Sequence, residues 1–95
     1  MVVGILVLDL RLAGCRSLKD KRQVLRSLLD KTRREFKVAI AEVGDQDLWG
    51  NALLCASCPS NAVDHVESVL FNVEKLFENH PDIEVASSIR DLWRP

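Results

Sequence analysis

The hydrophobic pattern begins with an apolar stretch near the start of the chain. Residues 2 to 12 (VVGILVLDLRL) are leucine-rich and β-branched, with Gly4 as the only breaker, so they predict one long strand. Successive side chains of a strand point to opposite faces. One face therefore holds the leucines at positions 6 to 12, and the other holds Val3, Ile5 and Val7 before it becomes polar at residues 9 and 11. We expect this strand to be apolar on both faces.

A helical period replaces the alternation after residue 16. Ser17 has the side chain of an N-cap, and Asp20 stands three residues later, in the manner of a capping box. Residues at helical spacing then carry the pattern to about Glu35. These residues are Leu18, Leu25, Leu28, Leu29, Thr32 and Phe36.

Two strands and a turn are predicted next. Residues 37 to 43 (KVAIAEV) predict a strand, and Gly44 and Asp45 begin a polar turn. A further strand runs from about Trp49 to residue 58, and Pro59 is expected to end it.

The last part of the chain predicts a second helix and a final strand. Ser60 or Asn61 is expected to cap the helix, whose apolar stripe runs from residue 63 to residue 77. Pro81 stops the helix, because proline disfavours helix at the residue before it. Ile83, Val85, Ser87 and Ile89 then alternate with polar or small residues and predict a strand on which they share one face, while residues 91 to 95 are expected to fray.

This order of elements, β-α-β-β-α-β, predicts the fold class. It is typical of the α+β ferredoxin-like split sandwich, a four-stranded antiparallel sheet with two helices on one face, here a single domain over residues 1–95. The first and third strands are central, and the helices cover one face only. We expect the apolar residues of the other face to be covered by self-association, as a dimer through the open sheet face or an edge. The alternative is a patch small enough for a monomer to tolerate.

Charge is distributed very unevenly along the chain. Nine of the thirteen basic residues and only three acids lie between Arg16 and Lys37, so this segment carries a charge of about +6, whereas the whole chain carries −1. A protein polarised in this way presents one positive face that can hold an anionic partner.

Five basic residues are predicted to form a stripe beside the buried side of the first helix. At about 100° per residue, they lie roughly 60° to 120° from the direction of Leu25. Such a stripe can follow a phosphate backbone. The alternative is a helix face that is only solvated, or one that pairs with acids of the second helix. We call the five residues the basic ridge: Lys19, Arg22, Arg26, Arg33 and Lys37.

Base stacking on the sheet is the other way in which such a domain could bind RNA. RNA-recognition domains stack bases on aromatic residues of their two central strands. Residues 2 to 12 contain no aromatic residue, and the third strand has only Trp49 at its edge. This mode is therefore disfavoured, and RNA should bind the helix.

Lys21 and the turn near residue 45 form a second group of candidates. Lys21 falls on the buried side of the first helix, so its ammonium must reach water or meet a carboxylate, for which Asp45 or Asp47 is available. Structural pairing is the favoured interpretation. A protein partner that contacts Lys21, Asp45, Asp47 and Trp49, or an enzyme that uses Lys21 and the two aspartates around an anion or metal, are the alternatives.

The cysteines and histidines do not form a recognisable site. Cys55 and Cys58 match C-x-x-C, but residues three apart on a strand point to opposite faces, and no second pair exists to complete a zinc site. We assign no catalytic residue, metal, cofactor or small-molecule substrate. Reduced thiols, with no signal peptide or membrane-spanning run, favour a cytoplasmic protein that does not enter membranes.

Two segments also resemble a known family. SLKDKRQVLRSLL (residues 17 to 29) and AEVGDQDLWGNALL (residues 41 to 54) are similar to the YlxP-like family of small bacterial proteins, a domain of unknown function. The resemblance covers roughly residues 1 to 85. It implies a ferredoxin-like fold and a bacterial cytoplasmic setting. It also implies work near RNA or the ribosome, because such proteins are often encoded beside translation-initiation and ribosome-maturation factors. Cys55, Cys58 and residues 92 to 95 lie outside the resemblance.

The sequence therefore predicts a non-enzymatic, self-associating accessory factor that contacts RNA or the ribosome through its basic first helix. The alternative is a regulatory or scaffold module that binds a protein through the sheet edge or the hairpin at residues 44 to 50.

Overall fold

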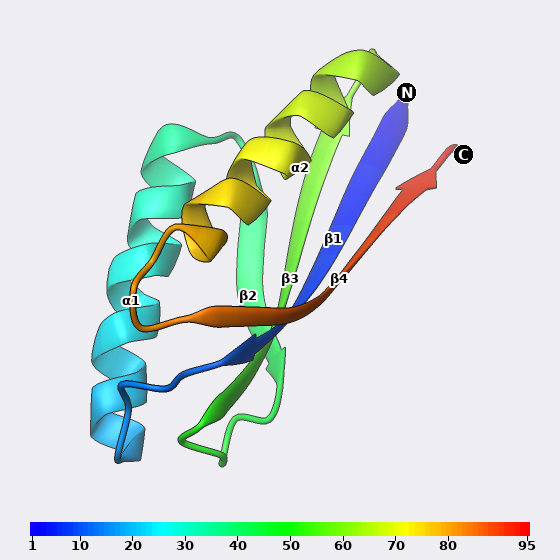
Figure 1. Cartoon of the computed structure of the whole chain (residues 1–95). Helices are drawn as coiled ribbons and strands as arrows, with labels where there is room; N and C mark the ends of the chain where they lie inside the picture. Colours follow the sequence, from blue (N-terminus) through cyan, green and yellow to red (C-terminus); the bar gives the residue numbers. More distant parts are fainter.

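The order of elements is the one that the sequence predicts. A computed structural model describes residues 1–95 (Figure 1). The four strands form one antiparallel sheet in the order β2-β3-β1-β4, so the first and third strands are central, and this confirms the ferredoxin-like fold. The elements are β1 (Val2–Arg11), α1 (Leu18–Glu35), β2 (Ala39–Gly44), β3 (Asn51–Ser60), α2 (Val63–Glu78) and β4 (Glu84–Trp93).

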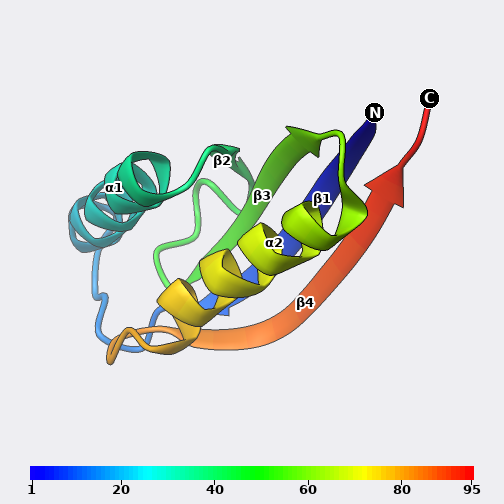
Figure 2. The ribbon, with the colours of Figure 1, turned by 90° about the horizontal axis from the view of Figure 1, so that it is seen from above.

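The helix-facing side of the sheet is the core of the protein. Alternate residues of β1, at even positions from Val2 to Leu10, are buried, whereas the odd positions are half-buried. Helix α2 packs across β1, β3 and β4, as Figure 2 shows. It comes so close to β1 that a Cβ atom at Gly4 would overlap the side chains of Val66 and Leu70. Gly4 therefore sets the approach of α2 to the sheet.

Helix α1 lies at the β2 side of the sheet (Figures 1 and 2). Ser17 caps it as predicted, because its hydroxyl accepts a hydrogen bond from the Asp20 N–H at 3.1 Å. The Asp20 carboxylate accepts in turn from the Arg16 N–H, one residue before the position that a capping box uses. The buried residues of α1 are Lys21, Leu25, Leu28 and Thr32.

Three predicted boundaries are wrong. Pro59 lies inside β3, which continues to Ser60. Proline has no N–H to donate to a neighbouring strand, but β2 begins only opposite residue 57, so at Pro59 the strand has β1 on one side and no strand on the other. The N-cap of α2 is Ala62 and not Ser60 or Asn61, because the Ser60 hydroxyl accepts from the Ala62 N–H and turns the chain before the helix starts. Residues 91 to 93 do not fray but pair with β1.

An irregularity in β4 changes which of its side chains face outward. Asp9 pairs with Ser87, but Leu10 pairs with Val85, so Ala86 is an extra residue in β4. Such a bulge reverses the alternation of the strand beyond it. The predicted common face of residues 83 to 89 is therefore interrupted, and Ile89 lies opposite Val7 on the open face with 63% of its surface exposed.

Neither α1 nor α2 is long and apolar enough to cross a lipid bilayer.

Candidate nucleic-acid interface

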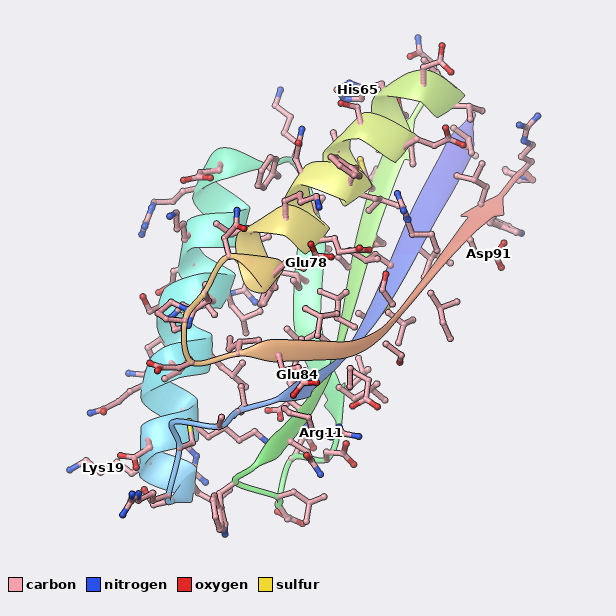
Figure 3. The ribbon with its side chains drawn as sticks, viewed as in Figure 1. Arg11, Lys19, His65, Glu78, Glu84 and Asp91 are labelled. Carbon is pink, nitrogen blue, oxygen red and sulfur yellow. The ribbon has the colours of Figure 1, made fainter.

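The basic ridge lies on the solvent side of α1. All five of its side chains are exposed, with Lys37 in the connection between α1 and β2. Figure 3 shows Lys19 at the start of α1, pointing away from the sheet. Burial of Leu25 and Leu28 fixes which side of the helix faces the core. The spacing of the ridge residues relative to these leucines then turns their side chains toward solvent. The structure thus places every predicted member of the ridge at the surface.

Most of the cations of this segment have no acidic partner within the chain. Of the nine basic residues between 16 and 37, only Lys21 and Arg33 form ion pairs, with Glu42 and Asp30 respectively. The Arg33 pair is a loose one, at 3.6 Å between half-exposed side chains, and Arg33 Nη2 also donates to the Ile40 carbonyl at 2.7 Å. Seven cations remain without an acidic partner: Arg16, Lys19, Arg22, Arg26, Lys31, Arg34 and Lys37.

The acids of α2 do not serve as partners for α1. Glu78 pairs with Lys75 of its own helix at 3.1 Å, which lowers the pKa of Glu78. The Glu74 carboxylate accepts a hydrogen bond from the Ser88 hydroxyl of β4. No ion pair joins the two helices. The predicted alternative of internal pairing with the second helix is therefore not what the structure shows.

Arg22 and Arg26 border two hollows on either side of the ridge. One is a groove of about 260 Å³ between α1 and β2, where Leu18, Leu25 and Leu29 provide the apolar surface. We call it the α1–β2 groove; its charged and polar lining residues are Lys21, Arg22, Arg26, Asp30, Arg33, Glu42 and Gln46. The other is an open depression on α1 whose lining residues are all polar or charged: Lys19, Arg22, Gln23, Arg26, Ser27 and Asp30. An anionic chain that lies along α1 would meet both arginines.

Lys21 has a structural position. Its side chain is 2% exposed, and Nζ donates to the carbonyl oxygens of Asp45 at 2.7 Å and Leu48 at 2.6 Å. Glu42 Oε2 completes the set as an ion pair at 2.7 Å, without the alignment of a hydrogen bond. The lysine thus links the β2–β3 hairpin to α1 through these contacts. Because its ammonium is buried, it is not available to a protein partner or to RNA.

The predicted carboxylate partners of Lys21 are wrong. The carboxylates of Asp45 and Asp47 belong to exposed residues, and Asp45 contributes only its backbone carbonyl. The residue that sequence reasoning missed is Glu42. A signal was present, because Glu42 shares the inward face of β2 with Ile40, and an acid at such a position needs a buried cation.

The hairpin between β2 and β3 is an exposed turn. Asp45 has a φ of 60°, a left-handed conformation that aspartate tolerates better than most residues. Trp49 is 51% exposed and therefore lies outside the core. No group of three or more metal-binding side chains forms in this protein.

The three thiols are free and separated. Cys58 is buried on the helix side of β3 and Cys55 is half-buried on the open side, as the alternation of a strand predicts. Burial raises the pKa of the Cys58 thiol, and burial together with Asp20 and Asp82 raises the pKa of the Cys15 thiol. The histidines lie apart: His65 is exposed, and His80 Nδ1 accepts from the Asp82 N–H.

These features define a small ferredoxin-like domain with an uncompensated basic helix. Residues 3–90 match the family described as "Protein of unknown function (DUF503)". The chain is 34% identical over 68 residues to the "Uncharacterized protein YlxP" of Bacillus subtilis (strain 168), which covers 72% of this chain and 74% of that protein. The chain therefore belongs to the DUF503 family, and its predicted resemblance to YlxP is confirmed.

The fold has a counterpart among solved structures. LFR1 1, a de novo designed protein with a ferredoxin fold, superposes with a TM-score of 0.52 at 13% identity, over 100% of this chain and 87% of the designed one. This likeness confirms the fold class and carries no information about function.

Proposed function

We propose that this protein is a non-enzymatic accessory factor that binds RNA, free or within a ribosomal particle, through the basic ridge. The observation that carries the proposal is the set of seven cations on and around α1 that have no acidic partner in the chain. Like charges held together on one helix repel each other, and phosphate groups relieve that repulsion. A net charge of −1 does not oppose this, since eleven of the fourteen acids lie outside residues 16–37.

Arg22 and Arg26 are the centre of the proposed interface. Each guanidinium can give two parallel hydrogen bonds to a phosphate, and neither is engaged within the chain. They are one helical turn apart and border both hollows. The leucines of the α1–β2 groove offer a ribose or a base an apolar surface beside these charges.

Charge reversal tests the proposal. In the variant Arg22→Glu/Arg26→Glu, the affinity for a fluorescently labelled single-stranded RNA should fall about 100-fold or more, because two charge-assisted contacts are lost and two acids are added. Fluorescence anisotropy measures this affinity, and co-sedimentation with ribosomes tests the particle. Circular dichroism and thermal unfolding should stay unchanged, because both side chains are exposed.

The matched control is Arg90→Glu/Arg94→Glu. It changes the net charge by the same amount, but on β4 and the residues after it. This control should bind RNA nearly as tightly as the unaltered protein. Unchanged RNA binding and unchanged ribosome co-sedimentation in the α1 variant would remove the proposal.

A second candidate function is protein binding through the hairpin. Three large apolar side chains are exposed at this end of the sheet: Val43 at 55%, Leu48 at 48% and Trp49 at 51%. In this case Trp49→Ala or Asp47→Ala would abolish capture of a partner in a pull-down, whereas the α1 charge reversal would leave it intact.

A further inference from the structure

The open face of the sheet, opposite the helices, carries two of the seven large hydrophobic side chains that the fold leaves exposed, Ile89 and Trp93. Strand pairing arranges its side chains in rows across the sheet. The row at Val7 contains Ile89, Val7, Cys55 and Ala41. The row at Ile5 contains Asp91, Ile5, Ser57 and Ala39.

Large and small side chains are divided between the two halves of this face. Strands β4 and β1 contribute the large ones, including Ile89 and Trp93, which are 63% and 56% exposed. At the Val7 and Ile5 levels, strands β3 and β2 contribute small ones, whereas Leu53 of β3, at the Asp9 level, is large. The large half contains Val3, Ile5, Val7, Ile89 and Trp93, together with the carboxylate of Asp91 in the Ile5 row, and the small half contains Ala39, Ala41, Cys55, Ser57 and Pro59.

We propose that a second copy of this chain covers the open face, related to the first by a two-fold axis that runs along the strands between β1 and β3. This axis places the large half of each copy on the small half of the other. Ile89 then lies over Ala41 of the second copy, and Val7 lies over Cys55. A two-fold interface must match itself in this way, and two packed sheets interdigitate in the same manner.

The other two-fold axis, across the strands, fits the face poorly. It would place β4 on β4, with large side chains against large ones and Asp91 close to Asp91. The Asp9 row, where Asp9 pairs with Arg11 at 2.8 Å and stands beside Leu53, does not follow the large–small division. This row lies at the end of the open face. Packed sheets cross at about −30°, so their ends move apart and the side chains of this row need not match those of the second copy.

Size and charge agree with a second copy as the occupant. Three strands of ten residues and β2 of six span at most roughly 34 Å by 19 Å, or about 600 Å² before side-chain relief. This approaches the roughly 800 Å² per partner of a stable interface. The α1 segments, each with a charge of about +6, lie in the helix layers on the outside of such a dimer and do not face each other.

The mass in solution is the first test. Analytical ultracentrifugation should give twice the chain mass of 10.7 kDa for the unaltered protein and the single-chain mass for Ile89→Glu. Ile89 is an exposed residue of an edge strand, so this variant should fold. The control is Phe71→Glu, at a 46% exposed position on α2, which should remain dimeric. A monomeric unaltered protein, or a dimer that Ile89→Glu leaves intact, would overturn the proposal.

Cross-linking tests the axis. In a Cys55→Ser background, Ile89→Cys and Ala41→Cys lie on opposite edges of one sheet, about 14 Å apart. In the proposed dimer they face each other across roughly 10 Å, so a bis-maleimide of that reach should join two chains efficiently. The variant with Ile89→Cys alone should not cross-link. Joining of two chains through position 89 alone, as packing of β4 on β4 requires, would exclude the proposed arrangement.

Discussion

The lysines on the two sides of helix α1 differ in burial and in their partners. Lys21 and Lys19 are two residues apart and chemically identical. Lys21 is surrounded by three oxygen atoms of the hairpin and is 2% exposed, whereas Lys19 is exposed and has no acidic partner. The inner cation stabilises the fold, and the outer cations are free for an anion outside the chain. The predictions below test this division.

Removal of the inner cation should have the largest effect. Lys21→Met leaves two hairpin carbonyls and the Glu42 carboxylate without their partner, so the free energy of unfolding should fall by about 2–4 kcal/mol. Urea unfolding followed by circular dichroism measures this. Lys19→Met, the matched change on the outer side, should alter stability by less than about 0.5 kcal/mol. Equal effects of the two substitutions would contradict the division.

The outer cations should make RNA binding dependent on salt. With about four phosphate contacts, the logarithm of the affinity for single strands should fall against the logarithm of salt with a slope near −3. The affinity then drops about 50-fold between 50 and 200 mM salt. Anisotropy titrations at several salt concentrations give the slope. A slope near zero would show that the ridge makes no phosphate contacts.

Arg33 is an exposed cation of the basic ridge and also makes contacts within the chain. Its removal should therefore affect both RNA affinity and stability, each to a smaller degree. It donates to the Ile40 carbonyl and approaches Asp30, whereas Arg26 is free. Arg26→Ala should weaken RNA binding about tenfold with no loss of stability. Arg33→Ala should weaken binding less and cost about 1 kcal/mol of stability. Measuring both quantities for both variants shows whether the structural bond of Arg33 reduces its part in binding.

The smallest expected effect concerns the buried thiols of Cys15 and Cys58. Burial raises the pKa of both, so the folded state keeps them neutral where the unfolded state ionises. Stability should therefore be unaffected below the ordinary thiol pKa of about 8.5 and should decline as the pH rises above it. Urea unfolding at pH 7 and pH 9.5 measures the decline. Cys15→Ala/Cys58→Ala should flatten it, and Cys55→Ala, on the open face, is the control.

Much of the fold could be predicted because short-range patterns specify it. The alternation in β1, the cap at Ser17 and the apolar stripe of α2 depend on neighbouring residues only. Two of the three boundary errors occurred where distant strands decide the outcome. Pro59 stays in β3 because β2 does not extend to its level, and residues 91 to 93 are ordered because β1 is there to pair with them.

The candidate site was predictable in part for the same reason. Helical spacing alone placed the basic ridge on the exposed side of α1. The partner of Lys21 was not predictable in this way, since Glu42 and the carbonyls of Asp45 and Leu48 reach it from 21 to 27 residues further along the chain. The α1–β2 groove also exists only because α1 lies beside β2.

By itself, the sequence determined the periodicity of each element and the side of α1 on which the charge gathers, because spacing along the chain decides both. Only the tertiary structure decided which cations stay free and which side chains of β4 occupy the open face. An ion pair requires two groups from separate elements to meet, and one extra residue in β4 was enough to turn Ile89 to the outside.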